Sequence, residues 1–277
     1  MAVQLVGLLP SDDLAAGVER WLVHDGAIAP RIALLADEKE DLYWHAIGDD
    51  FEPWIGVTHA SFAAHLASGR AHDRRLLVVH EDDRGPTLAT AAGFISSPID
   101  RERWAVAQIA SLCDGISAMA TRRRGFVHRR ACDPRTFVDA SGVARLRAYL
   151  ANGLFRAETG RGPFFRSPEQ VQLQLLTPAS DVFQLATTLY LALDGTHPFS
   201  RGEHGNDRWA SIVEDTPPPP RTTSPQLGQI IQLALAKRPG DRFLDPATFA
   251  AILRQHVPPV APSVYDEVAS AVRAQLL

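Results

Sequence analysis

The sequence is poor in cysteine and lysine, and each shortage excludes something. Cys113 and Cys132 are the only cysteines, which argues against a disulfide framework or a cysteine metal site and indicates a reducing compartment. Only Lys39 and Lys237 among the 28 basic residues are lysines, which restricts where a phosphate-binding lysine can lie. The chain also lacks an apolar run of membrane-spanning length and a start typical of a signal peptide. We therefore expect a cytoplasmic protein without membrane insertion.

What the chain does contain is enough apolar sequence for a packed core. It has 277 residues, of which 45% are hydrophobic and 22% charged, so it can form one bilobed domain or two small ones. The net charge of −4 and the pI of about 6.2 give no global attraction for nucleic acid. We therefore do not expect a nucleic-acid partner.

The segment 180–199 predicts a helix at the centre of the fold. Its apolar residues cover most of a helix circumference, which is typical of a buried helix. Ser180 is the predicted N-cap, and Asp181 in the first turn suits the helix dipole. Gly195 can end the helix, and Pro198 prevents its resumption.

This segment, read as Ser-Asp-Val-Phe-x-Leu-Ala-x-x-Leu-Tyr-x-x-Leu-x-Gly-x-x-Pro-Phe, resembles the central helix of the C-terminal lobe of protein kinases, most closely the bacterial Ser/Thr kinases. Other segments resemble kinase motifs in the family's order: 121–142 the catalytic loop, 167–169 the end of the activation segment, and 236–243 the segment with a late arginine. The resemblance implies an α+β, bilobal kinase-like fold.

The resemblance also divides the chain. We expect a reduced, strand-rich N-lobe at 1–80, a hinge at 81–86, a helical C-lobe at 87–257 and a C-terminal helix at 258–277. Within the N-lobe, 3–9, 18–23, 31–36 and 76–80 read as strands, and 49–68 as partly helical. In the C-lobe, 100–124, 226–236 and 247–256 read as helices, 136–138 and 144–148 as strands, and 200–223 as a polar loop.

The positions at which the resemblance implies chemistry carry unsuitable residues. Leu34 or Leu35 stands at the place of the lysine in the third strand, and Lys39 lies in a solvated charge cluster. Arg130 takes the place of the base aspartate, but an arginine cannot accept a proton near neutral pH. Arg135 replaces the metal-binding asparagine and Ala148 the metal-binding aspartate, so the oxygen ligands that Mg²⁺ needs are missing.

The positions that the resemblance assigns to the framework are retained. Asp181 is expected to hydrogen-bond the backbone around His128 and Arg129, which makes His128 a core residue. Glu169 and Arg242 are expected to form a buried ion pair. We therefore predict a pseudokinase: a protein that is not an enzyme, uses no cofactor or metal, and binds another protein as a scaffold or regulator. The partner would be a kinase, its substrate or a larger assembly.

Further interpretations stay open for four features of the sequence. The chain could be an atypical nucleotide-dependent transferase with a rebuilt site, in which Asp133 or Asp139 binds metal, although both residues also suit turns. A cluster of arginines could dock an anionic or phosphorylated partner segment, or simply form a solvated surface. The net charge disfavours a third use of the cluster, binding to nucleic acid. The members of the cluster are Arg129, Arg130, Arg135, Arg145 and Arg147. The run Pro217–Pro220 reads as a stiff loop or a polyproline ligand, and the C-terminal helix as packed on the C-lobe or as a seat for a second protein.

Overall fold

The computed structural model describes residues 4–9, 18–24, 31–36, 57, 59–63, 65–70, 72, 76–147, 165–199, 205–222 and 224–276. The chain forms two compact units. The first comprises Met1–Asp83 with Arg147–Thr159, and the second Arg84–Leu146 with Gly160–Leu277.

The first unit is built on an antiparallel sheet with the strand order β1-β2-β3-β6-β5. Its core lies where Val23, Ala33 and Val79 meet, with Trp21 and Leu77 packed against them. These are alternate positions on neighbouring strands, as expected where one face of a sheet is buried. The strands of this sheet are β1 (Gln4–Leu9), β2 (Val18–His24), β3 (Arg31–Ala36), β5 (His65–Arg70) and β6 (Leu76–Glu81). The short strand β4 (Phe62–Ala63) precedes β5 along the chain and is not part of this sheet.

The expectation of helix in 49–68 was wrong for its described C-terminal part. Residues 65–70 form β5, which pairs antiparallel with β6 from His65 opposite His80 to Arg70 opposite Leu76. Pairing with a neighbouring buried strand overrides a weak local helix preference. The part of this prediction at 49–56 lies outside the described residues.

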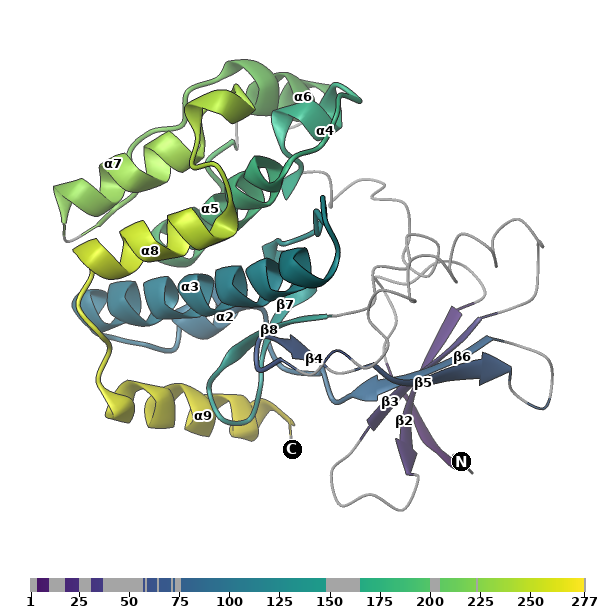
Figure 1. Ribbon diagram of the computed structural model, residues 1–277. Helices are drawn as coiled ribbons and strands as arrows, with labels where there is room; N and C mark the ends of the chain where they lie inside the picture. The colour runs from purple at the N-terminus through teal and green to yellow at the C-terminus, as the bar shows by residue number, and fades with distance from the viewer. Residues whose placement is uncertain are drawn as a thin grey trace. The chain divides into compact units, whose positions relative to one another are not determined.

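The second unit is helical, and its helices α3, α5 and α8 lie side by side in Figure 1 and contact one another. A hairpin of β7 (Thr136–Val138) and β8 (Ala144–Arg147) adds the only described strand pair of this unit. The helices are α2 (Leu88–Ala92), α3 (Pro98–Arg122), α4 (Pro168–Val171), α5 (Pro178–Asp194), α6 (Gly205–Glu214), α7 (Pro225–Ala234), α8 (Pro246–His256) and α9 (Pro262–Leu276), with 3₁₀ turns η2 (Asp133–Arg135) and η4 (Pro239–Asp241).

Helix α5 is buried along nearly its whole length, and it contacts α2, α3, α7 and α8. Its start differs from the prediction: the helix begins at Pro178 with Thr177 as the N-cap, and the Ser180 hydroxyl accepts a hydrogen bond from the Thr177 N–H. The error arose because proline is favoured in the first turn, which moves the cap upstream. Gly195 ends the helix in the left-handed conformation, at φ 73°.

Helix α9 packs on the second unit through Val264, Val268 and Val272, which are buried. It also closes over the β7–β8 turn, because Arg273 donates to the carbonyl of Ala140. Gly142 in this turn has φ 78°, and a Cβ there would lie 2.6 Å from the Tyr265 carbonyl oxygen. The turn therefore requires glycine both for its backbone and for the close approach of α9.

The prediction of a polar loop over 200–223 was wrong in part, because residues 205–214 form α6. Its last carbonyls are met by a side chain, since Lys237 Nζ donates to Ile212 O at 2.7 Å. Lys237 also lies 4.0 Å from the centre of the Phe199 ring. Burial lowers the pKa of Lys237 to about 8. The proline run after α6 has no regular structure, with Pro217 and Pro220 buried.

Candidate functional site

The first part of the candidate site is a buried carboxylate that holds a loop by its backbone. Asp181, fully buried in the first turn of α5, accepts hydrogen bonds from the N–H groups of His128 and Arg129, both at 2.7 Å. Burial raises the pKa of Asp181 to about 7, and the two backbone bonds oppose that rise. The 128–131 loop is therefore fixed to the central helix of the unit.

The loop contains a residue in a strained conformation. Arg129 has φ 70°, a left-handed conformation that non-glycine residues rarely adopt. Its carbonyl accepts from the side-chain amides of Gln170 at 2.8 Å and Gln184 at 2.9 Å, and Gln184 Oε1 accepts from Ala131 N at 3.0 Å. Backbone bonds on both sides of Arg129 thus hold the strain in place.

The side chains of the loop fall into two groups. His128 is fully buried, and burial together with the charge of Arg130 lowers its pKa to about 3, so it is neutral at neutral pH. Arg129 is exposed and Arg130 is half-buried. Within the part of the chain that the structure describes, neither arginine forms an ion pair with a carboxylate.

The other three arginines of the predicted cluster are engaged elsewhere or set apart. Arg145 pairs with Asp139 at 3.3 Å. Arg147 belongs to the first unit, where it donates to the Asp83 carboxylate at 2.5 Å and to the Asp83 carbonyl at 3.1 Å. Arg135 is half-buried at the end of η2. Arg129 is therefore the exposed member of the cluster that forms no ion pair among the described residues, and the half-buried Arg130 follows it in the loop.

Glu169 and Arg242 form a bidentate ion pair. Nη1 and Nη2 of Arg242 reach the two carboxylate oxygens of Glu169, each at 2.9 Å, and both side chains are buried. Burial alone would raise the pKa of Glu169, but the bonds and charge of Arg242, with a bond from Ser180, lower it. The remaining donors of Arg242 reach the carbonyls of Ala179, Ala236 and Lys237. The pair therefore ties α4 to α5 and η4.

The carboxylates considered as substitute metal ligands are already used by the fold. Asp133 accepts from the N–H of Ala89 at 2.8 Å, so it caps the start of α2. Asp139 accepts from the N–H groups of Ser141 and Val143 in the β7–β8 turn. The described residues contain no group of three or more acidic, histidine or cysteine side chains that could hold a metal ion. Where the structure describes them, Asp133 and Asp139 therefore serve the local fold.

Four residues named in the sequence analysis belong to the first unit. Leu34 and Leu35 are buried in β3, where their apolar side chains cannot bind phosphate. Lys39 and Ala148 lie outside the described residues.

We did not anticipate that Asp83, with no exposed surface, is paired with Arg20 and Arg147. The only signal in the sequence was an acidic residue in the loop that follows a buried strand, which is too common to identify a partner.

Comparisons with known proteins define the class of fold. No family model matches the chain. The kinase domain of Mycobacterium tuberculosis PknI has a TM-score of 0.67 at 19% identity, over 91% of this chain and 94% of that one. Among curated proteins, Corynebacterium efficiens drp72, a serine/threonine-protein kinase, is 33% identical over 44% of this chain and 25% of its own length. Mycolicibacterium smegmatis PknB is 27% identical over 60% of this chain and 28% of its own.

The chain therefore has a bilobal α+β protein kinase-like fold, as the sequence analysis predicted. More narrowly, the chain is similar in sequence to bacterial Ser/Thr kinases. The chain spans about a quarter of the length of the curated relatives it matches first. No helix in the described part of the chain is long and apolar enough to cross a membrane.

The prediction that the chain is not an enzyme was wrong. The relatives are named serine/threonine-protein kinases and the fold matches kinase domains, which together point to an enzyme. The prediction gave more weight to the replaced residues at single positions than to the similarity of the whole domain to kinase domains.

Proposed function

We propose that this chain acts in protein-kinase signalling by binding another protein through its second unit. Arg129 and Arg130 would hold an anionic segment of that partner, carboxylate-bearing or phosphorylated, because guanidinium groups bind both carboxylate and phosphate with paired hydrogen bonds. The partner would be a kinase, a kinase substrate or a component of a larger assembly.

One observation carries this proposal: Arg129 is held in a strained backbone conformation while its side chain stays exposed. The fold maintains φ 70° there with bonds from Asp181, Gln170 and Gln184. Strain of this kind concentrates at functional sites, where surrounding bonds maintain it. The same bonds fix the backbone from which the Arg129 side chain projects, and this reduces the conformational entropy lost when a partner binds.

The test is charge reversal with a matched control. The partner is first identified by co-purification from native cells, and its affinity is then measured for Arg129→Glu/Arg130→Glu and for Arg123→Glu/Arg124→Glu. The control pair is also exposed and lies a few residues upstream. We expect only the first variant to lose affinity, by tenfold or more, since each charged hydrogen bond contributes roughly 1.5–3 kcal/mol. Equal affinity of the two variants would refute the proposal.

Protein phosphorylation is the second candidate function, and the names of the relatives favour it. The reaction would need groups other than Arg130, which cannot accept a proton. A ligand at a hundred times its Kd stabilises a protein by about 2.7 kcal/mol, so Mg-ATP binding would raise the melting temperature measurably. Phosphate transfer to a protein that is lost in Asp133→Asn or Asp139→Asn would support a rebuilt site. The absence of both the melting shift and the transfer would remove this candidate.

A further inference from the structure

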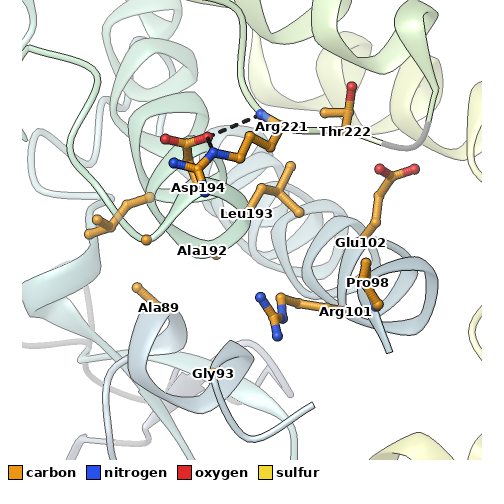
Figure 2. A pocket seen from close by; sticks show the side chains of 12 residues that line it. Ala89, Gly93, Pro98, Arg101, Glu102, Ala192, Leu193, Asp194, Arg221 and Thr222 are labelled. Carbon is orange, nitrogen blue, oxygen red and sulfur yellow. Dashed lines mark hydrogen bonds and ion pairs between the residues drawn. The ribbon is translucent and has the colours of Figure 1, made fainter. Parts of the chain in front are cut away.

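A pocket of about 370 Å³ lies in the second unit, and none of its lining residues belongs to the 128–131 loop. It is formed by the start of α3, the end of α5, α2, and the segment that follows the proline run (Figure 2). Its apolar wall includes Ala89, Pro98 and Leu193. The volume is at the lower end for ligand pockets, so it suits one or two side chains of a peptide rather than a large cofactor.

The charged groups around the pocket are not equivalent. The Asp194 carboxylate already has three polar contacts. It accepts hydrogen bonds from Arg221 N at 3.1 Å and from Thr196 Oγ1 at 2.8 Å, and it pairs with the Arg221 guanidinium at 3.3 Å. Glu102 is buried and engaged in other interactions, and Figure 2 shows its carboxylate on the Thr222 side of the pocket. The positive charge of Arg221 is therefore offset by Asp194.

Arg101 differs from these groups because its charge is not offset. Its Nε and Nη2 donate to the carbonyl of Ile95, at 3.1 and 2.8 Å, which fixes the guanidinium. Within the described residues it makes no ion pair. Figure 2 shows it pointing into the pocket on the side of Ala89 and Gly93. A fixed, half-buried cation beside an apolar wall complements a carboxylate that has an apolar neighbour.

We propose that this pocket binds an acidic peptide segment of a partner protein, with one carboxylate on Arg101 and one apolar side chain against Pro98 and Leu193. The proposal rests on the proposed function, since it names a second contact with a protein. It also explains the position of Pro217–Pro220: a stiff run places Arg221 over the end of α5, where it neutralises Asp194 and so removes a repulsive charge from the rim.

The experiment titrates the whole chain, methyl-labelled at leucine, with acetyl-Ala-Leu-Glu-Ala-amide and with the same peptide carrying Gln in place of Glu. The methyl resonances of Leu191 and Leu193 report on the pocket. We expect the Glu peptide to bind about tenfold more tightly than the Gln peptide. Arg101→Gln should abolish the difference, Arg101→Lys should retain most of it, and Arg103→Gln, two residues along the helix and outside the pocket lining, should leave it unchanged.

Three results would overturn the inference: equal binding of the two peptides, binding of acetate alone as tightly as the Glu peptide, or a preference for Glu that persists in Arg101→Gln. The retained charge in Arg101→Lys separates a lost contact from a folding defect. Failure of the proposed function is a separate outcome, because charge reversal at Arg129 and Arg130 leaves this pocket intact. The peptide titration of Arg129→Glu/Arg130→Glu should therefore match that of the unchanged protein.

Discussion

The buried pair of Glu169 and Arg242 allows the sharpest test of the structure. Removing one member of such a pair leaves an uncompensated buried charge, at a cost of about 3–5 kcal/mol. Glu169→Gln should lie near the lower end, because the amide keeps the shape of the side chain. Arg242→Met should lie near the upper end, because it also leaves the carbonyls of Ala179, Ala236 and Lys237 without their donor. The double variant should cost less than the sum by about 1–3 kcal/mol.

The assay is urea and thermal unfolding of the three variants and the unchanged protein. A loss of 3 kcal/mol corresponds to a fall in melting temperature of roughly 6–12 °C for a domain of this size. The control is Asp114→Asn, since Asp114 pairs with Arg254 at the surface, where their side chains are 47% and 51% exposed. That change should cost less than about 1 kcal/mol.

The pH dependence of the Glu169→Gln variant provides a second check. The pKa of Glu169 is lowered in the folded state, so its stabilising contribution is present above the unfolded value of 4.5 and is lost as the pH falls through the folded value. The stability gap between Glu169→Gln and the unchanged protein should therefore narrow below pH 4.5. Single losses below 1 kcal/mol, or strict additivity in the double variant, would refute the account of this pair.

Two further predictions concern the β7–β8 turn and the buried histidine. Gly142→Ala should lower the free energy of unfolding by about 2–4 kcal/mol, because of strain at positive φ and the close approach to Tyr265. The control Gly125→Ala, at φ 77° with open space around it, should cost about 1–2 kcal/mol. Equal losses of the two variants in urea unfolding would show that α9 does not approach the turn. The pKa of His128 is lowered from 6.5 to about 3 in the fold, so stability is lost as the pH falls below 6.5. Between pH 8 and pH 5 the unchanged protein should lose about 2 kcal/mol relative to His128→Asn. A constant gap would show that the pKa of His128 is the same in the folded and unfolded states.

The sequence predicted the elements whose signal is local and repeated. The apolar residues of 180–199 identified the central helix, and the short apolar runs at 18–23 and 31–36, bounded by turn residues, identified two strands. Helix α6 was missed because the segment around it is rich in polar residues and contains glycine, which is typical of a loop. Strand β5 was missed because it depends on pairing with β6, which its own residues do not indicate.

Contacts within the site could be predicted only where a motif of the resembled family specifies which residues interact. The resemblance linked Asp181 to the backbone at 128–129 and Glu169 to Arg242, and the structure has hydrogen bonds between those groups. The roles of Gln170 and Gln184 on the carbonyl of Arg129, and of Arg101 beside Leu193, depend on segments far apart in the chain. Such contacts arise from packing, so no spacing in the sequence reports them.

The most direct test of the central claim is the affinity of the co-purified partner for two charge-reversed variants, measured by titration calorimetry at fixed salt. The account predicts that Arg129→Glu/Arg130→Glu binds at least about tenfold more weakly than Arg123→Glu/Arg124→Glu, with both proteins melting like the unchanged chain. Indistinguishable dissociation constants for the two variants would show that the partner does not bind at the loop held by Asp181.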